Sequence, residues 1–339
     1  MPKLDRKVAY INPWGEHGDK LVIKVNGHTG LLGTVGGADY IPYDDIKDLT
    51  SYAILDVFDY VFIPFWGGFY DLIRKIRKTS KTKIVGIGDV ELNAIPYAPR
   101  KELSSLVECA KMCDIFLTSN PDTVPLFSSI RKDFTYDITG WCIYPEFHRQ
   151  YVIDPITKTF NHISIGCSNS GYNRNILENF LVFKKLLNDY PTITGHYWCV
   201  HPDHDTQIFE LTDRLEIPRE RVVLRRELQY QQFLSEFSKM YMSIHLYTFQ
   251  VVSRMAQDAM ALGVPHIGCT INYADRMFCP ASVNPYDVTM AYENAKRLIE
   301  DPQFYAMTRM EQVAGVSTYD ADTVGGKIIG AIEDYERRS

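Results

Sequence analysis

The stretch that begins at Gln250 carries the residue types and spacing most suited to chemistry. Helical periodicity starts after Ser253, and the first turn of a helix leaves backbone N–H groups unpaired at the positive end of its dipole. Ser253 and Arg254 would stand at this start, which suits a diphosphate, and Gln250 would lie at its mouth. Asp258 falls on the first turns, within reach of a ribose hydroxyl. Gly263 ends the expected helix.

Residues 258–265 read Asp-Ala-Met-Ala-Leu-Gly-Val-Pro. This segment resembles the donor-binding region of GT-B glycosyltransferases, especially the glycogen-synthase-like group. Those enzymes carry an acidic residue, seven intervening residues and then Glu-Ala-Met-Ala-x-Gly-x-Pro. The resemblance implies that Asp258 contacts the ribose and that Gln250, at the first acidic position, contacts the transferred sugar. Glutamine hydrogen-bonds sugar hydroxyls, but it does not stabilise a developing positive charge.

A loop rich in glycine, serine and asparagine follows the first expected strand of the second half. GT-B enzymes hold small residues and a lysine or arginine at this place, beside the donor phosphates. The resemblance implies that the backbone at Gly166 and Gly171 approaches the anion and that Arg174 supplies a charge-assisted fork. Ser168 and Asn169 are the polar members of the same expected donor site. The loop contains neither a GxGxxG nor a Walker pattern.

Arg225 and Arg226 follow the short apolar run at residues 222–224. The segment resembles the strand and loop that cradle the nucleotide base in the same family. The resemblance implies that one of these arginines contacts the base or a phosphate. The alternative is a pair of exposed charges at the start of a helix.

Two residues of the N-terminal half are candidates for a general base. Asp89 comes after the strand expected at residues 83–87, at its carboxyl end. His28 lies in a glycine-rich segment, residues 26–39, which is predicted to be a loop that ends at Asp39. An inverting transferase needs a base to accept the proton of the acceptor hydroxyl, whereas a retaining enzyme needs none.

Residues 201–205 read His-Pro-Asp-His-Asp and contain the D-x-D shape that GT-A glycosyltransferases use to bind a metal. They also resemble a His/Asp metal cluster. The same D-x-D shape recurs at residues 320–322, and the first copy lies in the second of two α/β repeats, where a GT-A fold would not place it. We therefore expect no metal ion and no cofactor, with a nucleotide sugar as co-substrate.

Strand-like and helix-like segments alternate along the chain, which favours parallel sheets covered by helices. The expected strands are residues 7–12, 60–64, 83–87, 115–118, 162–166, 195–200, 222–224, 242–246 and 265–268. The expected helices are residues 69–78, 103–112, 175–187, 206–215, 228–237, 254–262, 291–300 and 323–336. The pattern predicts an α/β fold of two Rossmann-like, doubly wound domains that face a central cleft, with the site at the carboxyl ends of the strands. We expect an N-terminal domain over residues 1–153, a C-terminal domain over 160–315 and a final helix in 316–339 that packs back on the first.

Composition fits an ordinary globular chain, with 45% hydrophobic and 23% charged residues in 339, enough for about two domains. We expect neither a membrane span nor a secretion signal. The seven scattered cysteines contain no C-x-x-C pair and predict a reducing, cytoplasmic location.

The net charge of −6 does not favour nucleic acid as a partner, although one basic run would suit a phosphate-rich acceptor. That run comprises Arg74, Lys75, Arg77, Lys78, Lys81 and Lys83.

These observations predict a metal-independent GT-B glycosyltransferase, a hexosyl- or pentosyltransferase that moves a sugar from a nucleotide sugar to an acceptor hydroxyl. The acceptor is left open between a glycan, a small molecule and a modified base in DNA. One alternative is a non-catalytic binding protein of the same fold, motivated by Gln250. The other is a nucleotide-sugar epimerase, which needs an acid/base pair in the same cleft.

Overall fold

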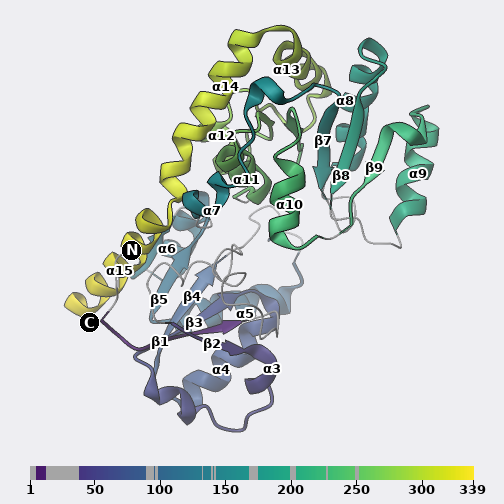
Figure 1. The fold of residues 1–339 in the computed structure, drawn as a ribbon. Coiled ribbons are helices and arrows are strands. Elements are labelled where there is room, and N and C mark those ends of the chain that lie inside the picture. Colours follow the sequence, from purple (N-terminus) through teal and green to yellow (C-terminus); the bar gives the residue numbers. More distant parts are fainter. Residues whose placement is uncertain are drawn as a thin grey trace. The chain divides into compact units, whose positions relative to one another are not determined.

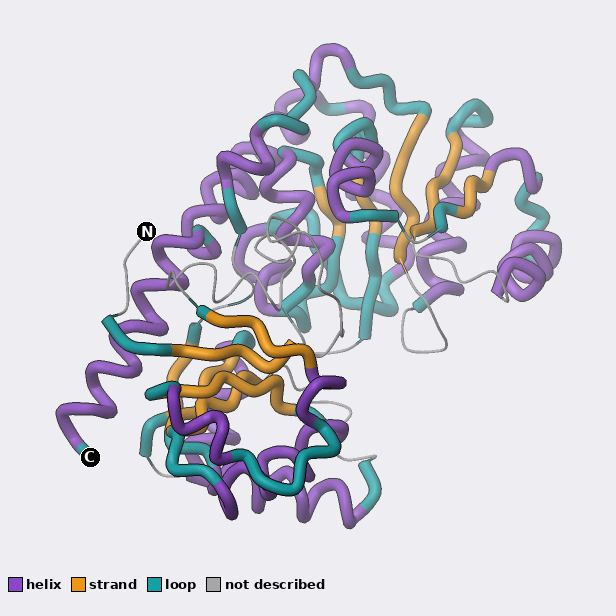
Figure 2. The backbone as a smooth tube through the Cα atoms, turned by 60° about the horizontal axis from the view of Figure 1, so that its bottom comes forward, coloured by secondary structure: helices purple, strands orange, loops and turns teal. Residues whose placement is uncertain are grey.

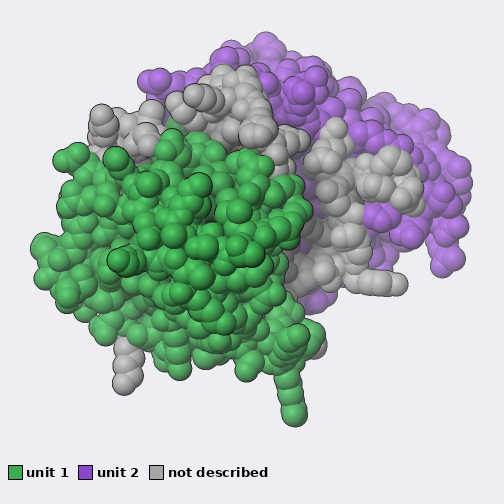
Figure 3. Space-filling view, turned by 90° about the horizontal axis from the view of Figure 1, so that it is seen from below, with its two compact units in different colours: residues 1–144, 318–339 green, residues 145–317 purple. Residues whose placement is uncertain are grey.

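The computed structural model divides the chain into two compact units (Figure 3). Unit 1 comprises residues 1–144 and 318–339, and unit 2 comprises residues 145–317. The structure describes residues 5–12, 38–88, 95, 98–131, 133–138, 140, 143–167, 175–198, 204–226, 228–248 and 252–339. Unit 1 is therefore discontinuous in sequence, and the chain enters unit 2 at Pro145 rather than near residue 153.

Unit 1 is built on a parallel six-stranded sheet in the order β2-β1-β3-β4-β5-β6 (Figure 1). Its strands are β1 (Val8–Asn12), β2 (Asp39–Pro42), β3 (Tyr60–Phe65), β4 (Lys83–Gly88), β5 (Ile115–Thr118) and β6 (Thr135–Asp137). Its helices are α3 (Tyr43–Ile46), α4 (Tyr70–Thr79), α5 (Arg100–Met112), α6 (Val124–Arg131) and α15 (Ala321–Arg338).

Successive side chains of a strand point to opposite faces of the sheet. In this sheet both sets are apolar, and helices cover both faces. In β1, Val8 and Tyr10 belong to a buried cluster that includes Ile328 of α15. Ala9 and Ile11 belong to the cluster on the other face, which the apolar sides of α4, α5 and α6 complete. The last helix of the chain is thus part of the core of the first unit.

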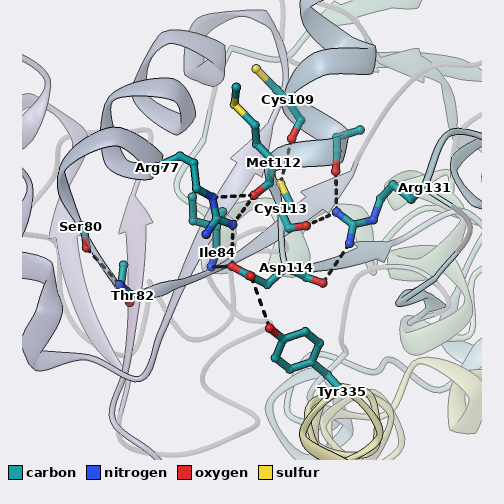
Figure 4. Close-up of polar contacts among 11 residues, drawn as sticks. Arg77, Ser80, Thr82, Ile84, Cys109, Met112, Cys113, Asp114, Arg131 and Tyr335 are labelled. Atoms are coloured by element: carbon teal, nitrogen blue, oxygen red, sulfur yellow. Dashed lines mark hydrogen bonds and ion pairs between the residues drawn. The ribbon is translucent and has the colours of Figure 1, made fainter. Parts of the chain in front are cut away.

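Asp114, between α5 and β5, joins three elements of unit 1 (Figure 4). Its Oδ2 accepts hydrogen bonds from Arg77 of α4 at 2.6 Å and from the backbone N–H of Ile84 in β4 at 2.8 Å. Its Oδ1 accepts a longer bond, 3.4 Å, from the hydroxyl of Tyr335 in α15. Arg77 also donates to the carbonyl of Met112, so this half-buried member of the basic run is already bonded to the protein at two places.

Unit 2 is built on a parallel five-stranded sheet in the order β11-β10-β7-β8-β9. Figure 2 draws the strands of both sheets in orange and the helices around them in purple. Its strands are β7 (His162–Cys167), β8 (Thr194–Trp198), β9 (Val222–Leu224), β10 (Ser243–Ile244) and β11 (His266–Ile267). Its helices are α7 (Pro145–Arg149), α8 (Ile176–Asp189), α9 (Asp205–Arg214), α10 (Tyr230–Phe237), α11 (Arg254–Leu262), α12 (Tyr273–Phe278), α13 (Val288–Glu300) and α14 (Pro302–Gly315).

The two faces of this second sheet are also packed separately. Ile163 and Ile165 of β7 lie in a buried cluster with Phe183 of α8. Trp198 of β8 packs in a different cluster, with Phe237 of α10 and residues of α11. Full burial of one such aromatic side chain contributes about 1.5–3 kcal/mol, so these two clusters fix α8 on one face and α10 and α11 on the other.

The predicted α/β class with two parallel sheets is confirmed, and most predicted elements lie within a few residues of their observed bounds. The prediction that the glycine-rich segment stays a loop as far as Asp39 is wrong, because Asp39 begins β2 and pairs with Ala9. In the part of the chain that the structure describes, we find no helix with both the length and the apolar character needed to cross a membrane.

Candidate functional site

Strand order in unit 2 marks one place where a ligand would bind. From β7 the chain moves outward to β8 and β9, and it then returns to the opposite side of β7 to form β10 and β11. β7 and β10 are therefore neighbours, paired at Ser164 and Ser243, although the connections that follow them run in opposite directions. In open α/β sheets, ligands bind outside the carboxyl ends of the strands at such a reversal.

Helix α11 follows β10 at this edge of the sheet, and its predicted bounds are confirmed. Ser253 is its N-cap, and the Ser253 Oγ accepts a hydrogen bond from the backbone N–H of Ala256 at 3.2 Å. The helix ends at Gly263, whose φ of 62° is a left-handed conformation that favours glycine. The Ser253 cap fixes where the helix begins, and therefore where the positive end of its dipole lies.

Asp258 lies one turn into α11 and is only 2% exposed. Its Oδ1 accepts a hydrogen bond from the hydroxyl of Tyr230 in α10 at 2.6 Å. The same oxygen lies 3.1 Å from Nε of Arg254 and 3.6 Å from Nε2 of His148 in α7. Three helices therefore converge on one carboxylate, and we refer to His148, Tyr230, Arg254 and Asp258 as the Asp258 cluster.

The Asp258 cluster keeps this carboxylate ionised. Burial by itself would raise the pKa of Asp258, but the positive charge of Arg254, the nearby ring of His148 and the hydrogen bond from Tyr230 outweigh it, so the pKa lies below its ordinary value. Burial raises the pKa of Tyr230 well above its ordinary value, so its hydroxyl stays protonated. The cluster thus holds a buried anion and a neutral phenol side by side.

Arg225 follows β9 and is held on three sides. Its Nε donates to Nδ1 of His196 at 3.2 Å, and its guanidinium lies 5.9 Å from the ring centroid of Trp198. Its Nη2 lies 3.4 Å from a carboxylate oxygen of Glu236, with about a third of the side chain exposed. This arginine is therefore fixed in position while part of it remains open to a ligand.

Arg226 forms a two-pronged ion pair with Asp205, at the first residue of α9. The guanidinium of Arg226 is therefore already paired with a carboxylate of the same unit. Asp205 is also the second acid of the D-x-D shape. Among the described residues, no group of three or more histidine, cysteine, aspartate or glutamate side chains is arranged to hold a metal ion.

Gly166 lies at the end of β7 with a φ of 112°, which L side chains rarely adopt. A Cβ there would also lie 3.1 Å from the ring of Tyr197 and 3.3 Å from Nδ2 of Asn179. Asn179 in turn accepts a hydrogen bond from the backbone N–H of Leu246 and donates to its carbonyl, at 2.8 and 3.2 Å. Asn179 therefore links α8 to the segment after β10, and sequence reasoning missed it.

Seven of the predicted site residues lie outside the part of the chain that the structure describes, so their places in the site stay predictions. They are His28, Asp89, Ser168, Asn169, Gly171, Arg174 and Gln250. Of the described ones, Ser253, Arg254 and Asp258 lie together on α11, whereas Arg225 and Arg226 follow β9. His148 and Tyr230 were not predicted as site residues, because only the folded unit brings them to Asp258.

The sequence matches no model of a protein family and no curated protein. Several solved structures, however, match over nearly all of the chain. HepE from Anabaena, in complex with UDP and glucose, has a TM-score of 0.73 at 13% identity, covering 97% of this chain and all of HepE. A trehalose-6-phosphate synthase from E. coli with UDP-2-fluoro glucose has a TM-score of 0.74 at 12% identity, covering 98% of this chain and 99% of the enzyme.

A UDP-forming α,α-trehalose-phosphate synthase from Burkholderia xenovorans matches at a TM-score of 0.71 and 12% identity, covering 98% of this chain and 100% of that enzyme. These neighbours are GT-B glycosyltransferases with two Rossmann-like domains. Identity this low establishes the fold alone. The chain described above, with one parallel sheet in each of two units, therefore has the GT-B fold.

Proposed function

We propose that the protein is a glycosyltransferase that takes a sugar from a uridine-diphosphate sugar and transfers it to an acceptor hydroxyl. The observation that carries the proposal is the start of α11 at the reversal of strand order, with ionised Asp258 one turn further on. Neighbours that match this chain from end to end include complexes with UDP and glucose and with UDP-2-fluoro glucose. They support uridine as the first nucleotide to test.

The proposed roles follow from the chemistry of each group. The N–H groups at the start of α11 and the guanidinium of Arg225 would stabilise the negative charge that develops on the departing UDP. Asp258 would accept hydrogen bonds from the ribose. In the reaction, the acceptor oxygen forms a bond to C1 of the sugar while the bond from C1 to the diphosphate oxygen breaks. In an inverting reaction, Asp89 or His28 would accept the acceptor's proton.

The remaining predicted donor residues complete this proposal. Gly166 and Gly171 would let backbone approach the diphosphate, with Ser168, Asn169 and Arg174 as its polar partners. Gln250 would contact the transferred sugar, while Arg226 is the weaker of the two arginine candidates because it already pairs with Asp205. We propose that the reaction needs no metal ion, since the helix start and the arginines supply the positive charge.

The main competing function is a non-catalytic protein that binds the same ligand, which Gln250 in place of an acid favours. A modified DNA base is less favoured as the acceptor, since two cations of the basic run are already paired. Arg74 contacts Glu108 at 2.7 Å, and Arg77 contacts Asp114 at 2.6 Å. Duplex DNA that bound at low salt and dissociated steeply with added salt would restore this acceptor.

A thermal-shift titration tests the donor site directly. UDP and UDP-glucose are added to the full-length protein in EDTA, and ligand at about 100 times its dissociation constant should add about 2.7 kcal/mol of stability. Arg225→Ala should weaken binding, whereas Arg219→Ala, which removes an exposed arginine paired with Asp213, should not. Absence of any shift with either ligand contradicts the proposal.

Catalysis is tested separately from binding. UDP release from UDP-glucose, followed with and without a mixture of candidate acceptors, should proceed in EDTA. Binding without any UDP release, across a broad acceptor set, would identify the non-catalytic protein instead. Activity that appears only after Mg²⁺ or Mn²⁺ is added would contradict metal independence while leaving the sugar transfer intact.

A further inference from the structure

The contacts of Asp258 are strongly one-sided. Tyr230, Arg254 and His148 all approach Oδ1, at 2.6, 3.1 and 3.6 Å. Among the hydrogen bonds of the described residues, the one to this carboxylate ends on Oδ1 and none ends on Oδ2. A carboxylate carries about four lone-pair sites, two on each oxygen, so one half of this buried anion is committed to the protein and the other half is not.

Hydrogen atoms in the Asp258 cluster can be assigned by counting donors. The hydroxyl of Tyr230 has one proton, which it donates to Asp258, and two lone pairs. Arg254 has only donors, so its Nη2 occupies one of those lone pairs. Nε2 of His148 lies 2.9 Å from the same oxygen and must donate to the other lone pair. The Tyr230 oxygen is therefore saturated, and its orientation is fixed by two other helices.

Burial strengthens this arrangement. His148 is 1% exposed, and Asp258 is 2% exposed. Away from water, a hydrogen bond to a charged oxygen is stronger, and a missing partner is more costly. The ring of Tyr230 also lies nearly parallel to that of Phe147 on α7, with centroids 6.3 Å apart. The phenol is thus held by both its ring and its oxygen.

We propose that Tyr230 and His148 are positioning residues for the nucleotide: with Arg254 they hold Oδ1 of Asp258, so that Oδ2 is presented to a ribose hydroxyl. This inference rests on the proposed function. It deepens that function by assigning ribose recognition to one oxygen and to two residues that touch the carboxylate but need not touch the ligand. The class of ligand so selected is a ribonucleoside diphosphate rather than its deoxy form.

The test compares UDP with 2′-deoxy-UDP and 3′-deoxy-UDP by calorimetry on the full-length protein. The wild type should bind UDP about tenfold or more tightly than one of the deoxy forms, because a hydrogen bond to a charged group is lost. Tyr230→Phe should reduce this ratio to about threefold or less while the variant still binds UDP. The ratio of the two dissociation constants depends on the orientation of Oδ2. It does not change when part of the protein is inactive, because that loss affects both ligands equally.

Tyr241→Phe is the matched control, since it also removes a phenol oxygen in unit 2 that donates a hydrogen bond, at 3.0 Å to the carbonyl of Leu298. It should keep the wild-type ratio. His148→Leu should lower the ratio, and His148→Gln should restore it, because a glutamine amide can donate from the place of Nε2. The two His148 variants therefore test the inference even if Tyr230→Phe does not fold.

The outcomes separate the two proposals. If the wild type binds none of the three nucleotides, the proposed function falls and the inference falls with it. If the wild type binds UDP and both deoxy forms equally, or if Tyr230→Phe and His148→Leu keep the wild-type ratio, the inference is overturned while the donor site stands. Loss of the ratio in Tyr241→Phe as well would show that the effect is a general loosening of unit 2, which also overturns it.

Discussion

Tyr335 donates a hydrogen bond to Asp114 at 3.4 Å, across 221 positions of sequence (Figure 4). The same carboxylate accepts shorter bonds from Arg77 and from the backbone of Ile84. One side chain thus connects α4, β4 and the last helix of the chain. The bonds from Arg77 and Ile84 are shorter than the bond from Tyr335, so we expect them to contribute more to the stability of unit 1.

Asp114→Ala should lower the free energy of unfolding of unit 1 by about 3 kcal/mol, because it leaves the Arg77 guanidinium and the N–H of Ile84 without their shared acceptor. Tyr335→Phe should cost less than about 1 kcal/mol, since the bond it removes is long. Urea denaturation of both variants measures the difference. Equal losses would contradict the assignment of Asp114 as the centre of this network.

His196 should make the stability of unit 2 depend on pH. Burial, together with the charges of Arg225 and His162, lowers the pKa of His196 to about 4. Its Nδ1 accepts from Arg225, and its Nε2 lies 3.1 Å from Nδ1 of His162, so protonation would disrupt this chain of contacts. The unfolded chain, with an ordinary pKa near 6.5, binds the proton more readily.

The free energy of unfolding is therefore expected to be highest above about pH 6.5 and to fall by roughly 3 kcal/mol as the pH drops to about 4. His196→Asn keeps an acceptor near the place of Nδ1 but does not titrate in this range. Chemical denaturation at several pH values should show a flatter dependence in His196→Asn than in the wild type. Parallel curves would contradict the prediction.

Ser253→Ala should cost about 1 kcal/mol, because Ser253 caps α11 and its Oγ accepts the N–H of Ala256. Ser129→Ala is the control, since the exposed hydroxyl of Ser129 only donates to the carbonyl of Pro125 within α6. That change should stay within about 0.5 kcal/mol. Thermal denaturation of the two variants checks this, and a null result for Ser253→Ala would show that water caps the helix equally well.

Gly263→Ala should destabilise unit 2 by about 1 kcal/mol or more, because φ is positive there and a Cβ would lie 2.8 Å from Nε of Arg309. Gly326→Ala, inside α15, meets no atom within 4 Å and should stabilise the chain by about 0.5–1 kcal/mol. The two substitutions add the same methyl group with opposite expected signs. Differential scanning calorimetry distinguishes them.

The sequence predicted the elements that carry strong local signals. Buried strand β5 (Ile115–Thr118) is a short apolar run, and α11 (Arg254–Leu262) lies between a serine cap and a glycine terminator, so the predicted bounds of both are confirmed. Edge strands β2 and β6 were missed because their residues are mostly half-exposed and form no apolar run. Helix α14 was also missed, although Asp301 and Pro302 form a recognisable start signal for it.

The site was less predictable than the fold. Asp258 and Ser253 were found because their spacing along one helix is visible in the sequence. Tyr230 and His148 were not found, since they lie on two other helices and the spacing between helices carries no periodic signal. Their contribution depends on packing of three elements around one carboxylate, which only the folded unit reveals.

Helix α15 closes one face of the sheet of unit 1, although all the strands of that sheet precede residue 145. During synthesis, the ribosome must therefore produce the whole of unit 2 before unit 1 can complete its core. Until then, the face formed by Val8, Tyr10 and their neighbours lacks its covering helix. A nascent chain with such an open apolar face is prone to aggregate and to recruit chaperones. Unit 2 is thus the first of the two able to finish folding, and the N-terminal unit is the last.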